Sequence, residues 1–450
     1  MTPARDIAAE ARDSAAEAHI VESLLGRHLY IADGSRIYDM PEDGADIADI
    51  LAALAPEHSR RIGAEPLGVP PLQTLSLNIA QACNMSCGYC YADEGKFGAK
   101  AKTMPEPVAL AAVDRLFCEA RPHQDLVIGF MGGEPLLARP LIHSVVAHAR
   151  AKAREDARRV RFSLTTNATL LRAGDVAFFA ANDFHIAISI DGARAANDTA
   201  RPLASGAGSY DKVVAALGLF ARHGAPRHLS ARATVTPRSG ALMDTLDHLI
   251  GLGFNSVGFS PVLVSPDPAL AFSPADFDHF CVEMIACGRK AKDAILAGRA
   301  YPFSNFETAL QELHRGSHRP YPCGAGAAYL SVDAKGDFYA CHRLVGDAAH
   351  AMGNITEGSD VAARAAHLIA RHVDKQEPCR SCWARYLCGG GCYHEVDRRG
   401  RPACDYIRAW LEFCIGAYVE ILDAAPGYFA VPETFFPAPA RAFELQGAMS

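Results

Sequence analysis

Residues 75–263 alternate between two patterns of hydrophobic and polar positions. Six short apolar runs are rich in β-branched residues, and they extend from LSLNIA (75–80) to SVGFSPVL (256–263). Between them lie segments with apolar residues three and four apart, such as PEPVALAAVDRLFCEA (105–120). The first pattern is typical of buried strands and the second of amphipathic helices. Six strands, each followed by a helix, predict repeated βαβ units and a parallel sheet. A further helix is expected at about 273–298.

The same periodicity fits two architectures, an open doubly wound sheet and an incomplete (β/α) barrel. In both, binding sites form at the carboxyl ends of the strands. Four unusual polar stretches follow the first four predicted strands: the cysteine-containing QACNMSCGYC (81–90), GGEP (132–135), TN (166–167) and SIDG (189–192). We therefore expect them to lie together at one edge of the sheet.

The regions on either side of the α/β repeat have different patterns. HLYIADGSRIYDM (28–40) alternates around an Asp-Gly pair, which predicts a hairpin, and ADIADILAALAPEH (45–58) predicts a short helix. EPLGVPPLQ (65–73) is typical of a linker. After about residue 300 the chain changes to short glycine- and cysteine-rich loops.

Composition places the chain among ordinary folded proteins. Half of its 450 residues are hydrophobic, 21% are charged, and the formal net charge is −7. No global positive field or long Lys/Arg run favours nucleic acid. The first twenty residues lack the apolar core of a signal peptide, and no window approaches the roughly 20 apolar residues of a spanning helix. A soluble, cytoplasmic protein is expected, with neither nucleic acid nor membrane as a partner.

Fourteen cysteines are many for such a protein. In a reducing compartment, clustered cysteines favour metal binding or redox chemistry over disulfides. Eight lie after residue 320 and three in the loop after the first strand. Cys118, Cys281 and Cys287 lie apart from these groups, and we expect them to be plainly buried.

The loop places Cys83, Cys87 and Cys90 in a C-x3-C-x2-C spacing. Four-iron clusters are usually held by four cysteine thiolates, so three leave one iron free to bind a small chelating molecule. A structural zinc site is the alternative, but zinc sites usually come as paired C-x2-C knuckles, and the loop contains no histidine.

Together, CNMSCGYC, MGGEPLL, TTN and SIDG resemble the radical S-adenosylmethionine (SAM) enzymes. The resemblance covers about residues 72–410 and implies a partial (β/α)6 barrel. In that family three cysteines hold a [4Fe–4S] cluster, and SAM chelates the fourth iron. Reductive cleavage of SAM gives a 5′-deoxyadenosyl radical, which abstracts a hydrogen atom from the substrate. An iron–sulfur electron carrier or scaffold is the alternative of another class, and the GGEP and SIDG stretches argue against it.

The resemblance also implies a set of cofactor contacts. An aromatic residue in the cysteine loop is expected near adenine, the GGE motif near the methionine amine, and two residues of SIDG near the ribose and methionine end. An arginine would pair with the methionine carboxylate, because its planar guanidinium suits bidentate binding. Arg201 and Arg232 are both available for that role. The expected cofactor-binding residues are Tyr89, Gly132, Gly133, Glu134, Asn167, Ser189, Asp191 and Arg201.

The later cysteines resemble the SPASM extension of radical SAM enzymes, which holds two auxiliary clusters. The supporting pattern is C-x2-C-x5-C-x3-C in CRSCWARYLCGGGC (379–392), with single cysteines on either side. A zinc ribbon is the alternative, but seven interleaved thiols exceed one zinc site. The family's interleaving implies one cluster on Cys379, Cys382, Cys388 and Cys404 and another on Cys323, Cys341 and Cys392.

The second auxiliary cluster would then lack one protein ligand. Cys281, Cys287 or His318 would complete it, or the position is open and exchangeable, which is the alternative we favour. His342 and Arg343 follow Cys341, and His394 and Glu395 follow Cys392. Either pair would tune a cluster through hydrogen bonds or belong to an ordinary solvated loop.

Enzymes with this extension mostly modify peptides or proteins. Sulfatase maturases resemble the chain over the barrel and the cysteines, but they typically carry an acidic residue where His342 stands. WARYLCGGGCYHE and CHRL look most like the crosslinking maturases, including that of quinohaemoprotein amine dehydrogenase. We therefore expect an intramolecular thioether, carbon–carbon or ether crosslink in a ribosomally made peptide or protein, with formylglycine formation or epimerisation as alternatives. The implied partners are that substrate and an electron donor such as flavodoxin or ferredoxin.

Four domains are expected. They are an N-terminal unit (1–70) that either recognises a peptide leader or caps the structure, a partial barrel (71–300), a SPASM domain (301–425) and a tail (426–450).

Overall fold

The computed structural model describes residues 17–41, 47–54, 68–98, 100–316 and 318–430, which group into two units. The barrel unit contains residues 71–271 and 328–360. The cysteine-rich unit contains the described residues up to 70, then 272–327 and 361–430. Each unit is therefore built from separate stretches of chain. The four domain boundaries expected from the sequence stay a prediction.

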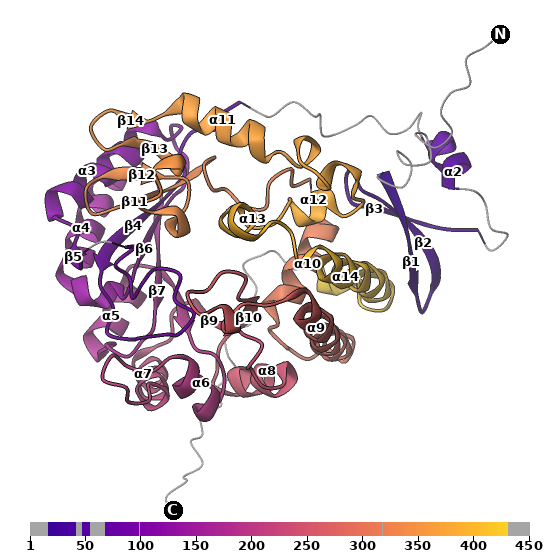
Figure 1. The fold of residues 1–450 in the computed structure, drawn as a ribbon, viewed down its shortest axis with the longest axis horizontal. Coiled ribbons are helices and arrows are strands. Elements are labelled where there is room, and N and C mark those ends of the chain that lie inside the picture. Colours follow the sequence, from indigo (N-terminus) through magenta and orange to yellow (C-terminus); the bar gives the residue numbers. More distant parts are fainter. Residues whose placement is uncertain (1–16, 42–46, 55–67, 99, 317, 431–450) are drawn as a thin grey trace, which may run out of the picture. The chain divides into compact units, whose positions relative to one another are not determined.

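Six parallel strands form the framework of the barrel unit, as the sequence predicts. Each predicted strand is present, and each pairs in parallel with the next along the chain (Figure 1). In sheet order they are β4 (Thr74–Gln81), β6 (Leu126–Gly132), β7 (Val160–Thr166), β8 (Phe184–Ser189), β9 (His228–Val235) and β10 (Ser256–Pro261).

The helices between these strands cover the outer face of the sheet (Figure 1). Phe130, Phe162 and Phe184 stack on adjacent strands, and Phe184 also contacts Phe178 and Phe179 of a covering helix. Such aromatic contacts contribute to the core in addition to their burial. The helices are α3 (Glu106–Glu119), α4 (Arg139–Glu155), α5 (Ala173–Ala181), the short α6 (Arg194–Ala200), α7 (Tyr210–His223) and α8 (Leu242–Gly251).

The opposite face of the strands is polar. Gly129 is paired with Ser76 on one side and with Ser163 on the other. A Cβ added at Gly129 would lie 3.1 Å from Ser163 Oγ and 3.6 Å from Ser76 Cβ, so these three residues share one face. Because side chains alternate along a strand, this face is opposite to that of Phe130 and Phe162. It is called the inner face below.

Four short strands extend the sheet beyond β4, and the sequence pattern does not reveal them. β11 (Tyr329–Val332) pairs in parallel with β4, and β12 (Asp337–Tyr339), β13 (Ala351–Asn354) and β14 (Gly358–Ser359) follow in antiparallel order. β5 (Lys102–Thr103) pairs with the other end of β4. Strands of two to four residues carry too little periodicity to be recognised, and β11 pairs with a strand some 250 residues away.

The cysteine-rich unit begins with an antiparallel sheet of three strands. The predicted hairpin is confirmed as β2 (Gly26–Ile31) and β3 (Arg36–Asp39), and β1 (Ala18–Ser23) adds a strand that the sequence did not predict. The predicted short helix is α2 (Ile47–Leu54). The other helices are α9 (Pro274–Leu296), α10 (Ser304–His314), α11 (Val361–Arg371), α12 (Arg385–Cys388), α13 (Tyr393–Arg399) and α14 (Cys404–Ala424).

Helices α9 and α14 pack closely against each other. A Cβ at Gly288 of α9 would lie only 2.4 Å from the Phe413 ring, so only glycine allows this approach. Cys281 and Cys287 are buried in α9, as predicted, but Cys118 is exposed, so its predicted burial is wrong. Cys118 lies on α3 outside the stripe of buried residues, which ends with Leu116 and Phe117.

Two expectations fall partly or mainly outside the described residues: the linker, whose residues 65–67 are not described, and the tail, described only to residue 430. Among the helices that are described, none is both long and apolar enough to span a membrane.

Candidate active site

The three-cysteine loop leaves the carboxyl end of β4 and is attached to the segment after α6. Ser86 N donates to Pro202 O at 3.0 Å, and Ala204 N donates to Asn84 O at 3.0 Å. The three thiols are half-buried, and Cys90 N donates to Cys87 O at 3.1 Å. Burial is the main reason that the pKa of Cys83 is raised to about 11, and the neighbouring Glu134, Cys87 and Cys90 contribute to the rise. Thiols in such a site become thiolates when a positive metal centre balances their charge.

The GGE glycines allow the loop after β6 to pack against β4. A Cβ at Gly132 would lie 2.3 Å from Ala80 O, and one at Gly133 would lie 2.2 Å from Ala82 O. Both distances are too short for any side chain, so the two strand ends meet this closely only with glycine. The sequence does not show this intramolecular role, because the resemblance implies only that the glycines lie near the cofactor.

Glu134 connects the ends of three strands. Its side chain is completely buried, and it accepts hydrogen bonds from Thr166 Oγ1 at 2.7 Å, Asn167 N at 2.7 Å and Leu136 N at 3.0 Å. Burial raises the pKa of Glu134, and these hydrogen bonds oppose that rise. Asn167 Nδ2 in turn lies 3.8 Å from Cys83 Sγ. The carboxylate therefore orients the asparagine that contacts the first cysteine.

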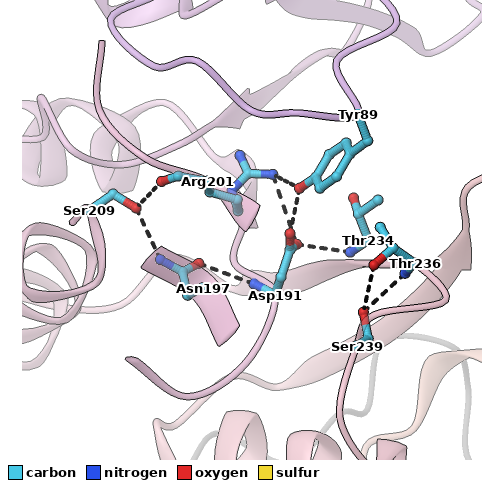
Figure 2. A network of polar contacts seen from close by, with 8 residues as sticks. All are labelled: Tyr89, Asp191, Asn197, Arg201, Ser209, Thr234, Thr236 and Ser239. Carbon is cyan, nitrogen blue, oxygen red and sulfur yellow. Dashed lines mark hydrogen bonds and ion pairs between the residues drawn. The ribbon is translucent and has the colours of Figure 1, made fainter. Parts of the chain in front are cut away.

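Tyr89, Asp191 and Arg201 form a second buried network, and Figure 2 shows their polar ends pointing toward one another. Tyr89 Oη donates to Asp191 Oδ2 and accepts from Arg201 Nη1 at 2.5 Å. Asp191 Oδ1 accepts from Thr234 N at 2.9 Å and lies 3.8 Å from the guanidinium. Burial disfavours the charge on Arg201, but Tyr89, Cys87 and Asp191 outweigh that effect and hold its pKa well above the ordinary value.

This network is supported from behind by α6 and the start of α7. Asn197 accepts from Asp191 N at 3.2 Å and donates to Ser209 Oγ at 3.0 Å, and Ser209 Oγ donates to Arg201 O at 2.6 Å (Figure 2). Asp198 accepts from Ser209 N at 2.8 Å and holds the start of α7. All of these groups are fixed by partners within the barrel unit.

Ser189 and Arg232 lie outside the Tyr89–Asp191–Arg201 network. They face each other in the register of β8 and β9, at the carboxyl half of the strands. The structure therefore separates the two arginines proposed for the methionine carboxylate: Arg201 lies within the network, and Arg232 lies on the inner face of the sheet beside Ser189.

A chain of hydroxyl groups crosses from β4 to the loop of Cys341. Ser76 Oγ hydrogen-bonds Tyr329 Oη and Ser331 Oγ, each at 2.8 Å. Tyr329 Oη lies 3.2 Å from Nδ1 of His342, which follows Cys341 directly. Cys341 Sγ accepts from the backbone N of Arg343 at 3.3 Å. His342 is therefore half-buried and held by Tyr329 of β11.

Four cysteines gather in the cysteine-rich unit: Cys379, Cys382, Cys388 and Cys404. Burial is the main reason that the pKa of Cys379 is raised to about 11, and each of the other three sulfurs contributes to the rise. Arg401 opposes this rise at Cys379, and Arg408 hydrogen-bonds Cys382. These are the four cysteines that the family's interleaving assigns to one cluster.

The three cysteines that are expected to hold the other auxiliary cluster belong to different units. Cys323 and Cys392 lie in the cysteine-rich unit, where burial and, to a smaller extent, both sulfurs raise the pKa of Tyr393. Cys341 lies in the barrel unit. His318 lies against Gly34 of the N-terminal sheet, and Cys281 Sγ lies 4.0 Å from Tyr406 O. Within the described ranges, no three His, Cys, Asp or Glu side chains are arranged to hold a single metal ion.

Comparison with known proteins identifies the family. Residues 77–260 match the model of the radical SAM superfamily, the segment that carries the cysteine loop and both buried networks. The chain is a radical SAM enzyme. Its C-terminal region is of the SPASM type, and it is related to the anaerobic sulfatase-maturating enzymes.

One relative of this radical SAM enzyme is the serine-type anaerobic sulfatase-maturating enzyme of Klebsiella aerogenes. The two are 26% identical over 353 residues, which cover 75% of this chain and 84% of the relative. The solved structure of anSMEcpe with bound AdoMet, another name for SAM, superimposes with a TM-score of 0.69 at 20% identity, covering 80% of this chain and 97% of the other. Streptococcus suis SuiB bound to its precursor peptide SuiA gives a TM-score of 0.52 at 13% identity, covering 86% and 97%. These likenesses confirm the partial barrel.

The radical SAM enzyme's first cofactor fits the residues present. Three thiols from one loop, with the Asn167 amide beside Cys83, supply the ligands and a polar neighbour for a [4Fe–4S] cluster with one open iron. SAM is the molecule that the family binds at that iron.

Proposed function

We propose that this radical SAM enzyme is a peptide or protein maturase that installs an intramolecular crosslink. When bound, the cluster and SAM would supply a 5′-deoxyadenosyl radical that removes a hydrogen atom from the substrate. The observation that carries the proposal is the meeting of the cysteine loop, GGE, Asn167 and Asp191 at one edge of the sheet in a chain with seven further cysteines in SPASM spacing.

The chain's own residues would position the reactants. Glu134 and Asn167 would hold Cys83 in place, and Tyr89 and Arg201 would fix the far side of the cysteine loop. The cysteines at 379, 382, 388 and 404 would hold an auxiliary cluster, and Cys323, Cys341 and Cys392 another. His342, held by Tyr329, would face the substrate from the inner wall.

Relatives support a peptide substrate. The sulfatase-maturating enzyme acts, as its name states, on another protein, and the SuiB structure contains a precursor peptide. Crosslinking is favoured over formylglycine formation because a histidine replaces the acidic residue that is typical of sulfatase maturases after the cysteine matching Cys341. Formylglycine formation is the second candidate, and the similarity to the Klebsiella enzyme over most of both chains favours it.

Intact mass together with an aldehyde-specific hydrazide distinguishes the two. The protein would be co-expressed anaerobically with each short open reading frame beside its gene, and each candidate peptide would be weighed before and after treatment with the hydrazide. A loss of two hydrogen atoms that is absent with Cys83→Ala, in a peptide that does not react with the hydrazide, supports a crosslink. Formylglycine from Ser has the same loss of two hydrogens, and formylglycine from Cys exchanges a sulfur and two hydrogens for an oxygen, but either product forms a hydrazone, which supports the second candidate. An unchanged mass for every peptide, with SAM still cleaved, contradicts both for these peptides and leaves epimerisation, which incorporation of solvent deuterium would detect.

A further inference from the structure

Three consecutive glycines, 389–391, form a tight loop between Cys388 and Cys392 in the cysteine-rich unit, called the glycine loop below. All three have positive φ, at 73°, 91° and 81°, a conformation that residues with a side chain rarely adopt. A Cβ at Gly389 would also lie only 2.6 Å from the backbone of Pro322. The loop therefore follows a path that requires glycine.

The glycine loop presents backbone N–H groups to a cysteine sulfur. Burial raises the pKa of Cys388, and hydrogen bonds from the backbone N–H groups of Gly390 and Gly391 oppose that rise. Successive N–H groups that converge in this way form a concave site for a negatively charged atom. Cys388 belongs to the group of four cysteines that is expected to hold an auxiliary cluster, so the loop favours the thiolate form of one cluster ligand.

Arg401 holds the other side of the same loop. Its guanidinium donates to Gly390 O and to Gln376 Oε1. The C=O of Gly390 and the N–H of Gly391 belong to one trans peptide group, so they point in opposite directions. A cation bonded to this carbonyl therefore keeps the N–H directed toward Cys388, and it strengthens that donor by polarising the peptide group.

The charge of Arg401 is not balanced by a carboxylate. Its two acceptors are neutral oxygens, and among the residues that the structure describes no Asp or Glu pairs with it. Arg380 and Arg408 of the same unit, in contrast, each pair with a carboxylate. Burial raises the pKa of Cys379 and of Cys404, and the charge of Arg401 opposes the rise at both, together with Arg408 at Cys404. Arg401 is half-buried, so the thiolates are its natural counter-charge.

A cation and converging N–H donors beside cysteine ligands favour the reduced form of a cluster. Reduction adds an electron to a centre that four thiolates already make negative, and nearby positive charge and N–H···S hydrogen bonds stabilise the added charge. We infer that Arg401 is a positioning residue that raises the reduction potential of the cluster at Cys379, Cys382, Cys388 and Cys404, through the glycine loop and through its own charge. The inference rests on the auxiliary cluster of the proposed function and adds to it the residue that sets the potential.

The experiment is an anaerobic redox titration of the reconstituted whole chain, followed by electron paramagnetic resonance. The signal of this cluster is identified by its absence in Cys382→Ala/Cys388→Ala. Arg401→Gln removes the charge and should shift the equilibrium toward the oxidised form about ten-fold, or about 59 mV for one electron. Arg401→Lys keeps the charge and should shift it less.

Two further variants separate the charge of Arg401 from other effects. Arg380→Gln is the matched control, because Arg380 directly follows Cys379 but is exposed and paired with Glu377, so its loss should leave the potential unchanged. Gln376→Glu keeps an acceptor for the Arg401 guanidinium and balances its charge, so the potential should fall as in Arg401→Gln. Gln376→Glu also gives up the hydrogen bond from Gln376 Nε2 to Arg371 O, so iron and sulfide are measured for every variant.

The inference is overturned if Arg401→Gln retains the cluster at the wild-type potential, or if Arg380→Gln shows the same shift. If Arg401→Gln does not retain the cluster, the potential of Gln376→Glu decides in the same way. Loss of the cluster from both variants also overturns the inference, because Arg401 would then serve only to build the site. Failure of the proposed auxiliary cluster is recognised separately, because the wild type would then contain no more iron than Cys382→Ala/Cys388→Ala.

Discussion

At the scale of single residues, the site is built on buried charges that satisfy one another. Asp191 and Arg201 lie 3.8 Å apart, and Tyr89 Oη bonds to both. Removing one partner of a buried pair leaves an uncompensated charge, which costs far more than the pair itself contributes. Removing the hydroxyl between them leaves both charges, which can close the remaining gap.

Removing the charge of Asp191 should therefore destabilise the protein more than removing the hydroxyl of Tyr89. Asp191→Asn should lower the free energy of unfolding by about 3–5 kcal/mol, because Arg201 then remains buried without a counter-charge. Tyr89→Phe should lower it by only about 1–2 kcal/mol, the contribution of hydrogen bonds to charged groups. Urea unfolding of both variants at pH 7 gives the two values. Equal losses would mean that the pair contributes little beyond its hydrogen bonds.

The sequence identified these residues but not how they are used. The cysteines and the glycines directly follow predicted strands. The sequence therefore placed them at the carboxyl edge of the sheet. The sequence does not show that Tyr89 contacts Asp191 and Arg201, because more than a hundred residues separate Tyr89 from each of them. Nor could the sequence distinguish Arg201 from Arg232, because only the fold shows which arginine already has a partner.

At the scale of elements, strands β8 and β9 carry a histidine pair on the inner face. The rings of His185 and His228 lie 4.0 Å apart. Burial is the main reason that the pKa of His185 is lowered to about 4; the charges of His228, Arg161 and Arg227 contribute to the shift, and Asp183 opposes it. The pKa of His228 is lowered as well, mainly by burial and by Arg227.

Acid should therefore destabilise the protein through this pair. Between pH 6.5 and about 4 the unfolded chain binds a proton at His185 that the folded chain does not, so stability falls as the pH falls through this range. His185→Phe should flatten this part of the profile, measured as the urea midpoint at pH 7, 6 and 5. His223→Phe, on the exposed end of α7, is the control and should leave the slope unchanged. An unaltered slope in His185→Phe would assign the acid sensitivity to other groups.

The N-terminal sheet is another element whose contacts bear on its role. His19 of β1 stacks on Trp383 at 4.1 Å, and Arg385 pairs with Glu17 at 2.6 Å and with Asp374 at 3.3 Å. These contacts attach the sheet to the four-cysteine group within the cysteine-rich unit. They favour the structural-cap interpretation of this region, and leader recognition stays untested.

Arg385 is 2% exposed, so the attachment depends on its ion pairs. Asp374→Ala should lower the free energy of unfolding by about 3 kcal/mol, because it leaves a buried arginine with one partner fewer. Arg385→Met keeps most of the volume without a charge and should cost less. Thermal unfolding of the two variants gives this order, and a larger loss in Arg385→Met would show that the guanidinium's hydrogen bonds dominate.

At the scale of the whole molecule, the cysteines form groups that the structure assigns to separate units. Cys83, Cys87 and Cys90 belong to the barrel unit, and Cys379, Cys382, Cys388 and Cys404 to the cysteine-rich unit. The C-x3-C-x2-C spacing predicted the first set, and the resemblance to the SPASM extension implied the second. The sequence could not predict that strands β11–β14 join the barrel sheet and carry Cys341 into that unit, since they are joined to it through the non-local pairing of β11 with β4.

If the three-cysteine and four-cysteine groups hold separate clusters, substitutions in one group should not remove iron from the other. Three four-iron clusters would give about twelve irons per chain after anaerobic reconstitution. Cys83→Ala/Cys87→Ala/Cys90→Ala and Cys382→Ala/Cys388→Ala should each lose about four, and the combined variant about eight, because neither group contributes ligands to the other. Iron and sulfide assays on each variant measure this, with Cys118→Ala as a control that should lose none, since Cys118 is exposed and outside every set. A loss of all iron from either variant alone would show that one cluster is needed to build the others, and an unchanged count in Cys382→Ala/Cys388→Ala would contradict the auxiliary site.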